Sequence, residues 1–454
     1  MRGNYDNIDW GVWFLLLVHT LFCKVWLGMS SDQITEISSS EPPQQHDEGD
    51  DGVRLGQPRS SALLSSVSRS RNYDVISIKD TAAVEVHSTY LYPDVDVSFS
   101  GKGLNCGAPL SEPCFDFERC RNGSSGIYVY DGNCSLADSS ALLRPQEKEQ
   151  DRWKQKCDDL DLILRNEAEK AGLLAQTYES ACLFVAATTR FTSCAVGQPL
   201  WNSGSNHLLV DLSDRGRNRR REVADSYAME AASNMRTSFY RTGYDISVPL
   251  APRNVFPALA AISPWDRQFF LTTKGSVYLS RGGSEERMSL VPLHDERNGV
   301  VMSLHCFEMH GEHLLPENVE YCKSLKDRYD DHDYEGLMNT TFGLVPAGRS
   351  PGTYRLGEVM SAGSIPVFVG RDMVLPFRED FDWPSFSFMF SPDQVGSHMV
   401  RTLQAVSRAE LEEMQRKLLE VYREMFGTDK RDFRPMANKI IDILHKRLGH
   451  RSGL

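Results

Sequence analysis

Short apolar runs alternate with helix-spaced segments through most of the chain. The runs at residues 181–187, 300–306 and 365–369 have the length and the β-branched or aromatic content of buried strands. Residues 147–178 and 411–426 instead place apolar side chains every three or four positions, as in helices that pack one face against a core. Strands that alternate with helices form parallel sheets, so the pattern predicts an α/β fold with two doubly wound, Rossmann-like domains that face one cleft.

Two other patterns precede this part of the chain. Residues 10–29 form an apolar run, interrupted by His19 and Lys24, that is close to the ~20 residues a membrane helix needs. We predict an uncleaved membrane anchor here, after a cytoplasmic tail of residues 1–9, and a cleaved signal peptide is the alternative. Residues 30–103 are polar and rich in Ser, Asp, Glu, Gln and Pro, which predicts a disordered stem. Both alternatives place the remainder of the chain in the secretory lumen.

Composition narrows the range of functions. The chain has 454 residues, of which 41% are apolar and 25% are charged, so it can form two or three domains with substantial cores. Its formal net charge of −12 argues against nucleic acid as the main partner. Nine of its 10 cysteines follow the predicted anchor, and lumenal cysteines tend to pair. We therefore expect several disulfides and at least one cysteine that is unpaired or bridges to another molecule.

Residues 339–377 carry the most informative local pattern. The apolar run at 341–345 predicts a strand, and the following loop at 346–352 contains two glycines, an arginine and a serine. Ser350 is expected to cap a helix that continues to about Ala362, before another strand. The segment is therefore expected to form a strand, a glycine loop, a helix and a second strand.

This predicted unit offers an anion site. A glycine loop that leads into a helix N-terminus can bind phosphate, because free backbone N–H groups and the helix dipole both favour negative charge. Arg349 adds a guanidinium fork that fits a diphosphate. Arg355 and Glu358 are three residues apart and share one helix face, from which the carboxylate can reach the hydroxyls of a ribose. An ordinary strand–helix–strand unit with a surface Arg–Glu pair is the alternative.

The order of residues in this segment closely resembles the nucleotide-sugar donor segment of the exostosin family of glycosyltransferases, which follows the pattern TFxLVPxGRxxGxxRxxEAxxAxxxPV. The positions that match this pattern, or the LPF that follows it, are Thr341, Phe342, Leu344, Val345, Pro346, Gly348, Arg349, Gly352, Arg355, Glu358, Ala362, Pro366, Val367, Leu375, Pro376 and Phe377. Other segments that resemble the family are CFDFERC at 114–120, GIYVY at 126–130, ACLFV at 181–185, WNSGSNHLLVDL at 201–212, YDISVPL at 244–250 and FFLTTKGSVYL at 269–279. The resemblance extends from about Cys106 to the last residue.

The resemblance implies a fold and an activity. It implies the GT-B fold, with an acceptor-side domain at residues 104–255 and a nucleotide-sugar donor domain at 256–454. It further implies an inverting transferase that moves a sugar, with glucuronate as the leading expectation, from a UDP-sugar to a heparan-like glycan or another extracellular polysaccharide. Plant-type relatives use UDP-galactose, UDP-xylose or UDP-arabinose, so the donor sugar stays open. The alternative is a catalytically silent relative that binds glycan or stabilises another transferase.

The resemblance also assigns roles to residues. The donor site is expected to contain Lys274, Arg287, Gly348, Arg349, Ser350, Tyr354, Arg355 and Glu358. Transfer needs a general base from the acceptor half. His207 is the first choice, followed by Asp116 and Asp211, and a structural histidine bonded to the backbone is the alternative for His207. Asn206 is expected to contact the acceptor.

A basic run departs from the family pattern. Residues 215–221 contain five arginines, and we predict that Arg217 and Arg219 help to hold an anionic acceptor. A solvated loop and a furin-type processing site are the alternatives.

Animal exostosins carry a second transferase domain after the part that this chain resembles. The sequence ends where that domain would begin, so we expect at most one activity.

The sequence also predicts disulfides and a glycosylation site. The family has a cysteine pair that corresponds to Cys306 and Cys322, which implies a disulfide. Cys106, Cys114 and Cys120 are close enough for one local disulfide, for which Cys114 and Cys120 are our choice. The preferred glycosylation site is Asn122.

Neither Asp-x-Asp sequence, at 94–96 or 380–382, lies where the family has a metal role. We therefore expect no cofactor and no required divalent ion, with UDP-sugar as a substrate. The predicted anchor and the resemblance imply a single-pass type II protein of the Golgi or endoplasmic reticulum membrane, with a homodimer or a heterodimer with another exostosin-type transferase as expected assemblies.

Overall fold

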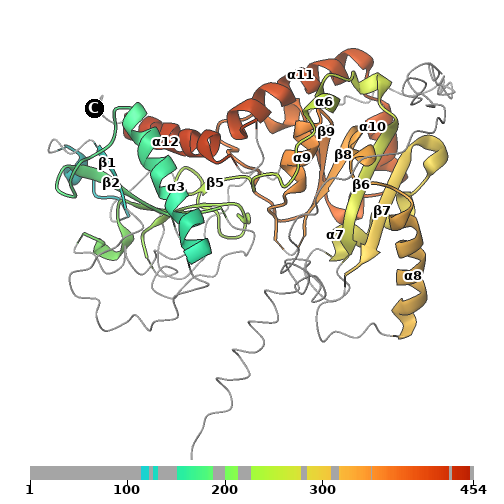
Figure 1. The fold of residues 1–454 in the computed structure, drawn as a ribbon, viewed down its shortest axis with the longest axis horizontal. Helices are drawn as coiled ribbons and strands as arrows, with labels where there is room; N and C mark the ends of the chain where they lie inside the picture. Colours follow the sequence, from blue (N-terminus) through green and yellow to red (C-terminus); the bar gives the residue numbers. More distant parts are fainter. Residues whose placement is uncertain are drawn as a thin grey trace, which may run out of the picture. The chain divides into compact units, whose positions relative to one another are not determined.

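The computed structural model describes residues 114–121, 126–130, 151–187, 200–212, 226–277, 284–307, 316–348, 350–428 and 432–449. All of them belong to one compact unit, Ala82–Leu454. The predicted tail, anchor and stem lie outside the described residues. None of the described helices is long and apolar enough to cross a membrane. Figure 1 shows the described part as a ribbon, with two sheets and the helices that accompany them.

The first sheet contains five parallel strands in consecutive order. They are β1 (Gly126–Val129), β2 (Ala181–Ala187), β3 (His207–Asp211), β4 (Met229–Ala232) and β5 (Ile246–Ser247). The helix α2 (Phe117–Arg121) precedes β1, and α3 (Asp151–Lys170) connects β1 to β2. Each strand lies next to the one before it in sequence, so the strand order never reverses. The double winding that we predicted is therefore not found among the described strands of this sheet. Alternation of strands and helices predicts parallel pairing, but it does not set the order of the strands.

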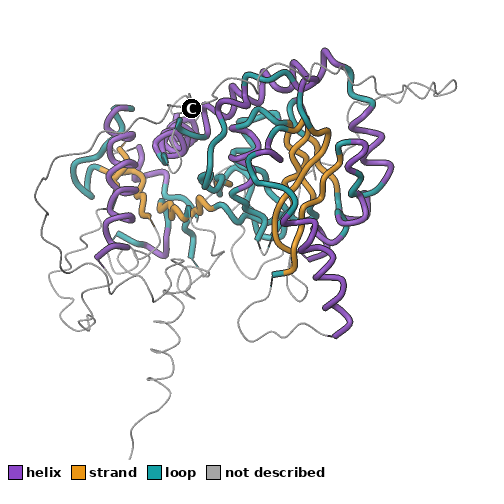
Figure 2. Tube along the Cα trace, turned by 45° about the vertical axis from the view of Figure 1, so that its right-hand side comes forward, coloured by secondary structure: helices purple, strands orange, loops and turns teal. Residues whose placement is uncertain are grey.

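The second sheet has the predicted doubly wound order, β10-β9-β8-β6-β7, and all its pairings are parallel. Its strands are β6 (Phe269–Val277), β7 (Val300–Cys306), β8 (Thr340–Pro346), β9 (Ile365–Val369) and β10 (Phe388–Phe390). The helices α8 (Pro316–Asp330) and α9 (Arg355–Ser361) connect its strands, and helices lie on both sides of the sheet (Figures 1 and 2). The strand order reverses between β6 and β8, and ligands of such sheets bind where the order reverses, beyond the carboxyl ends of the strands.

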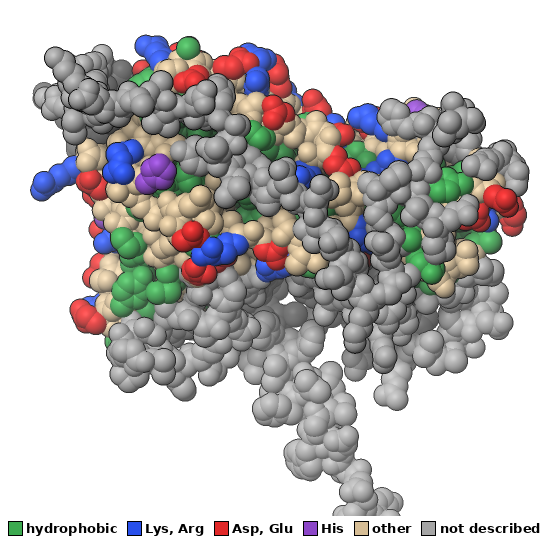
Figure 3. All heavy atoms as spheres, turned by 180° about the vertical axis from the view of Figure 1, so that it is seen from behind, with side chains coloured by type: hydrophobic (Ala, Val, Ile, Leu, Met, Phe, Trp, Pro, Cys, Tyr) green, Lys and Arg blue, Asp and Glu red, His purple; other side chains and the backbone are tan. Residues whose placement is uncertain are grey.

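Shorter helices and the C-terminal helices complete the fold. They are α6 (Pro257–Ala260), α7 (Ser284–Met288), α10 (Ser397–Gln404), α11 (Arg408–Met425) and α12 (Arg434–Gly449), with short 3₁₀ turns that include η6 (Glu296–Asn298) and η7 (Gly336–Met338). The predicted amphipathic helix at 411–426 is confirmed as α11, which begins with a capping box formed by Ser407 and Glu410. Acidic and basic side chains are interspersed on the face seen from behind (Figure 3), and α11 contributes ion pairs such as Arg416–Glu413.

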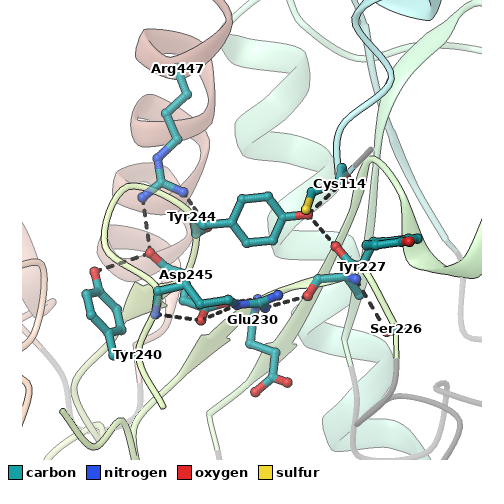
Figure 4. A network of polar contacts seen from close by, with 10 residues as sticks. Cys114, Ser226, Tyr227, Glu230, Tyr240, Tyr244, Asp245 and Arg447 are labelled. Carbon is teal, nitrogen blue, oxygen red and sulfur yellow. Dashed lines mark hydrogen bonds and ion pairs between the residues drawn. The ribbon is translucent and has the colours of Figure 1, made fainter. Parts of the chain in front are cut away.

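The last helix returns to the first sheet. Figure 1 shows α12 beside α3, and the two helices are in contact. From α12, Arg447 donates hydrogen bonds to the carbonyl oxygens of Tyr244 (2.6 Å) and Asp245 (3.1 Å). Figure 4 shows this junction, where the buried Asp245 also pairs with Arg241 at 2.6 Å. Helix α12, near the end of the sequence, therefore stabilises the half of the molecule that contains the first sheet.

The disulfides confirm one prediction and correct another. Cys306 and Cys322 are bonded, which joins the end of β7 to α8. Cys120 is bonded to Cys182 rather than to Cys114, so the predicted local pair is wrong, and Cys114 belongs to another disulfide. The reason is that α2 packs against β2, which brings Cys182 within a Cα–Cα distance of 4.7 Å although it is 62 residues away in sequence. Sequence proximity alone could not show this partner.

Candidate active site

A cavity of about 380 Å³ lies at the carboxyl ends of β6 and β8, where the strand order of the second sheet reverses. Every described member of the predicted donor set lines it, namely Lys274, Arg287, Gly348, Ser350, Tyr354, Arg355 and Glu358. Arg349 lies outside the described residues. The cavity is also lined by Arg253, Asn254 and Tyr334, which sequence reasoning missed.

The glycine loop is longer than predicted. Helix α9 begins at Arg355, its N-cap is Tyr354 without a side-chain cap, and Ser350 therefore does not cap it. The cause is a close contact at Gly352, where a Cβ atom would lie only 2.2 Å from the carbonyl oxygen of Ser233, directly after β4. The chain must pass this backbone before it can start a helix. Since α9 has only seven residues, side chains rather than a long helix dipole supply most of the positive charge at this site.

Arg355 is the most constrained cation of the cavity. Its side chain is nearly buried, with 6% exposure. Nε donates to the carbonyl oxygen of Leu344 at 2.8 Å, and Nη1 donates to the carbonyl oxygen of Lys274 at 3.3 Å and to the Tyr334 hydroxyl at 3.4 Å. Nη2 is buried and has no hydrogen-bond partner among the described residues. Buried donors are nearly always satisfied, so an unused guanidinium donor in a cavity wall points to a ligand acceptor.

Glu358 is buried beside Arg355 and holds several donors. Its carboxylate accepts hydrogen bonds from the Tyr334 hydroxyl, from the Asn254 backbone N–H at 3.2 Å and from Asn254 Nδ2 at 3.5 Å. A carboxylate has about four acceptor positions, so little capacity remains for the ribose hydroxyls that we predicted. Asn254 follows the segment 244–250 that resembles the family, and this proximity was the one available signal for it. Tyr334 lies in a strongly charged stretch whose pattern gave none.

Lys274 lines the cavity, but its ammonium group is bonded to the protein. Its ammonium group donates to the carbonyl oxygens of Tyr329 and His332, beside the C-terminal end of α8, and lies 3.6 Å from the centre of the Tyr329 ring. Burial lowers the pKa of Lys274, while Asp330 and Asp333 act to raise it. The side chain therefore stabilises the α8 terminus, whereas we predicted a direct contact with the ligand.

Two further arginines face the cavity. Arg287 Nη1 donates to the carbonyl oxygen of Ser276 at 2.6 Å and Nε to that of Ala347 at 3.2 Å, so this residue joins the ends of β6 and β8. The guanidinium of Arg253 lies over the Tyr354 ring, 4.0 Å from its centre. Among the described residues that line the cavity, these two and Lys274 and Arg355 are four cations, and Glu358 is the one carboxylate. This excess favours an anionic ligand.

His207 is a structural residue. It is fully buried, its Nδ1 lies 2.8 Å from the carbonyl oxygen of Ser205, and its Nε2 lies 2.9 Å from the Tyr130 hydroxyl. Its ring stacks on Phe184 with 4.7 Å between the centres. With both nitrogens bonded inside the core, His207 does not reach a substrate, and our first choice of general base is corrected in favour of the structural alternative.

Burial lowers the pKa of His207 to about 4, which predicts a pH dependence of stability. Its ordinary value is 6.5, so between pH 6.5 and 4 the unfolded chain binds a proton that the folded chain excludes. The corresponding stability is complete above pH 6.5 and is lost as the pH falls toward 4, by roughly 3 kcal/mol at most. Denaturation at both pH values should show a smaller acid loss for His207→Gln than for wild type. Equal losses would contradict the assignment.

Other predicted residues of the first half are structural or remain candidates. Asn206 accepts from the Asp116 N–H at 2.7 Å and donates to the Cys182 carbonyl at 3.0 Å, so it holds α2 on β2 instead of contacting an acceptor. Asp116 is exposed and caps α2 through the Arg119 N–H at 3.1 Å, a local role that does not need a substrate. Asp211 lies half-buried at the carboxyl end of β3 and remains the candidate base.

Three further predicted residues, Asn122, Arg217 and Arg219, lie outside the described residues. In the second half, Asp380 of the Asp-x-Asp sequence is ion-paired with Lys439 at 3.0 Å and with Lys446 at 3.5 Å. A carboxylate held by two lysines is poorly suited to bind a metal ion. Independence from divalent ions stays a prediction.

Comparisons with known proteins identify similar sequences. A family model described as "Exostosin GT47 domain" matches residues 126–406. Exostosin-1 of Drosophila melanogaster is 35% identical over 199 residues, which cover 41% of this chain and 26% of the relative. Exostosin-1a of Danio rerio is 28% identical over 299 residues (60% and 38%), and Exostosin-1 of Bos taurus is 28% identical over 307 residues (62% and 38%). The matches thus span at most 38% of the length of these curated relatives.

Solved structures give only weak matches. MurG of Acinetobacter baumannii aligns with a TM-score of 0.28 and 11% identity, covering 65% of this chain and 79% of that one. The pneumococcal O-GlcNAc transferase GtfA in complex with UDP and GlcNAc aligns with a TM-score of 0.31 and 9% identity, covering 59% and 56%. TM-scores this low do not establish a shared fold or a shared site.

Proposed function

The chain belongs to the exostosin GT47 family, and from this premise we propose that it is an inverting glycosyltransferase that moves a sugar from a UDP-sugar to a glycan. The observation that carries the proposal is the cavity at the strand-order reversal of the second sheet, with four cations, one carboxylate and the unpartnered Nη2 of Arg355. A diphosphate fits a cationic cavity of this kind, because charge-assisted hydrogen bonds to phosphate are strong.

The proposed reaction assigns each part a task. An acceptor hydroxyl forms a bond to the anomeric carbon, the bond from that carbon to the diphosphate breaks, and UDP leaves with the electron pair. Arg287 and Arg355 would stabilise the negative charge that develops on the leaving diphosphate, without a metal ion. The hydroxyl proton passes to a base, for which Asp211 is the candidate. The contact between Gly352 and Ser233 supports an acceptor position near the carboxyl edge of the first sheet, as in the GT-B arrangement.

The finer assignments extend this proposal. We take glucuronate as the donor sugar, because its carboxylate adds a negative charge to the diphosphate and the cavity has cations in excess. A heparan-like glycan in the Golgi or endoplasmic reticulum is the proposed acceptor. These assignments follow from the resemblance to exostosins and from charge. The proposal that the cavity binds a UDP-sugar does not depend on them.

Calorimetric titration of the purified chain tests the proposal. UDP should bind, UDP-glucuronate should bind more tightly than UDP-sugars whose sugar carries no charge, and an excess of EDTA should leave both affinities unchanged. CMP serves as the control nucleotide. Absence of UDP binding would overturn the proposal, and loss of binding in EDTA that Mn²⁺ restores would overturn its metal-free form. Binding without transfer to heparan-like oligosaccharides or other polysaccharide acceptors would indicate the catalytically silent alternative.

A further inference from the structure

Tyr334 joins the two buried charges of the cavity. It lies between α8 and η7, outside the motif segments quoted above but within the residues 126–406 that the family model matches. Its hydroxyl donates to Glu358 Oε2 and accepts from Arg355 Nη1 at 3.4 Å. Its ring lies near the Arg355 guanidinium, 5.7 Å from ring centre to Cζ, and near the ring of Phe256, at 6.3 Å. One hydroxyl therefore bridges a cation and an anion on the same face of α9.

The chemistry of a phenol explains why a bridge differs from a direct ion pair. A hydroxyl has one proton to donate and lone pairs to accept, so it can satisfy a carboxylate and a guanidinium together. Burial raises the pKa of Tyr334 well above its usual value, Arg355 acts to lower it and Glu358 to raise it, so the hydroxyl stays protonated at physiological pH. A direct Arg355–Glu358 pair would instead occupy guanidinium donors. With the bridge in place, Nη2 of Arg355 remains without a partner in the part of the chain that the structure describes.

The position of Tyr334 is fixed by its neighbours in sequence. The carbonyl oxygen of His332 accepts from Lys274 Nζ, and His332 Nε2 lies 3.0 Å from Glu296 Oε1. On the other side, the Gly336 N–H donates to Asp333 Oδ1 at 2.7 Å. The hydroxyl is thus held in place by contacts that do not involve the ligand. This rigidity suits a residue that orients others, because a group held before binding need not be ordered at binding.

We propose that Tyr334 is a positioning residue of the donor pocket, which acts through Arg355 and Glu358 and keeps Arg355 Nη2 available for an acidic group of the ligand. The inference rests on the proposed function and deepens it. It assigns a role to a residue outside the glycine loop and outside the quoted motif segments.

Tyr334→Phe tests the inference, because it removes the hydroxyl and keeps the ring. We expect about 5- to 20-fold weaker UDP binding and a similar rise in the KM for the UDP-sugar, as for loss of one hydrogen bond within a charged network. The KM for the acceptor should stay unchanged. In a Glu358→Gln background, Tyr334→Phe should cost less than in wild type, since the bridged carboxylate is already absent. Tyr422→Phe, which removes a hydroxyl from α11 away from the cavity, is the matched control.

The outcomes separate the inference from the function on which it rests. If wild type binds UDP and Tyr334→Phe binds it within twofold, the inference is wrong and the proposed function stands. A lower melting temperature with unchanged UDP affinity also overturns it, because that result indicates a purely structural role. Equal costs of Tyr334→Phe with and without Glu358→Gln contradict action through Glu358. If wild type does not bind UDP, both proposals fail.

Discussion

Replacement of Arg355 by methionine should weaken UDP binding at least 30-fold, which corresponds to about 2 kcal/mol. Methionine fills a similar volume but has no donor, so the substitution removes the Arg355 nitrogen, Nη2, that has no partner among the described residues. It also removes the bonds that Arg355 donates to the carbonyl oxygens of Leu344 and Lys274 and to the Tyr334 hydroxyl. The ligand loses a charge-assisted contact, and the wall of the cavity loses the group that joins β6, β8 and α9.

Calorimetry with UDP and with UDP-glucuronate measures this effect. Arg355→Lys should recover only part of the affinity, because an ammonium group cannot reproduce the planar fork that reaches two strand ends and a hydroxyl. Arg401→Met is the control, since Arg401 is exposed on α10 and does not line the cavity. If Arg355→Met folds and binds UDP as wild type does, the nucleotide lies elsewhere and the donor site must be reassigned.

Sequence reasoning succeeded where the site is built from one local unit. The glycine loop, Arg355 and Glu358 belong to one strand–loop–helix segment, so spacing alone places them together. Lys274 was predicted only from the resemblance to the family, and the structure explains its place in the cavity lining, because β6 pairs with the neighbouring β8. The doubly wound order of the second sheet was likewise predicted, because repeated strand–helix–strand units favour it.

The failures involve contacts between distant segments. The start of α9 depends on the approach of Gly352 to Ser233, and the disulfide of Cys120 depends on how α2 packs against β2. Tyr334 enters the site from a charged loop whose composition predicts only a solvated surface. In the first two cases the decisive neighbour lies far away in sequence. Tyr334 is only 21 and 24 residues from Arg355 and Glu358, but a loop separates them, so neither periodicity nor spacing indicates the contact.

His207 shows a different limit. It was placed correctly at the start of a strand, but alternation along a strand cannot tell a cleft-facing side chain from a buried one when both faces are covered. Here β3 is buried on both faces along most of its length. Burial on both faces, rather than the position at the strand start, determines the low pKa of the histidine and its structural role.

Replacement of Asp245 by alanine should destabilise the protein by about 3–5 kcal/mol, a large part of the roughly 5–15 kcal/mol that folded domains have. Asp245 is fully buried and accepts from Arg241 Nη2 at 2.6 Å and Nε at 2.9 Å. It also accepts from the backbone N–H groups of Arg241 (3.1 Å) and Glu230 (3.0 Å), as Figure 4 shows in part. Alanine therefore leaves a buried guanidinium without its counter-charge and two amides without their acceptor.

The contrast with a surface pair makes this prediction specific. Arg416 and Glu420 have the same four-residue spacing and the same 2.6 Å N–O distance as Arg241 and Asp245, but about half of each side chain is exposed. Glu420→Ala should leave the unfolding midpoint in urea nearly unchanged, because solvent screens the pair. Asp245→Asn, which keeps the shape and one carbonyl acceptor, should fall between the two. If Asp245→Ala unfolds at the urea concentration of Glu420→Ala, burial does not strengthen the pair.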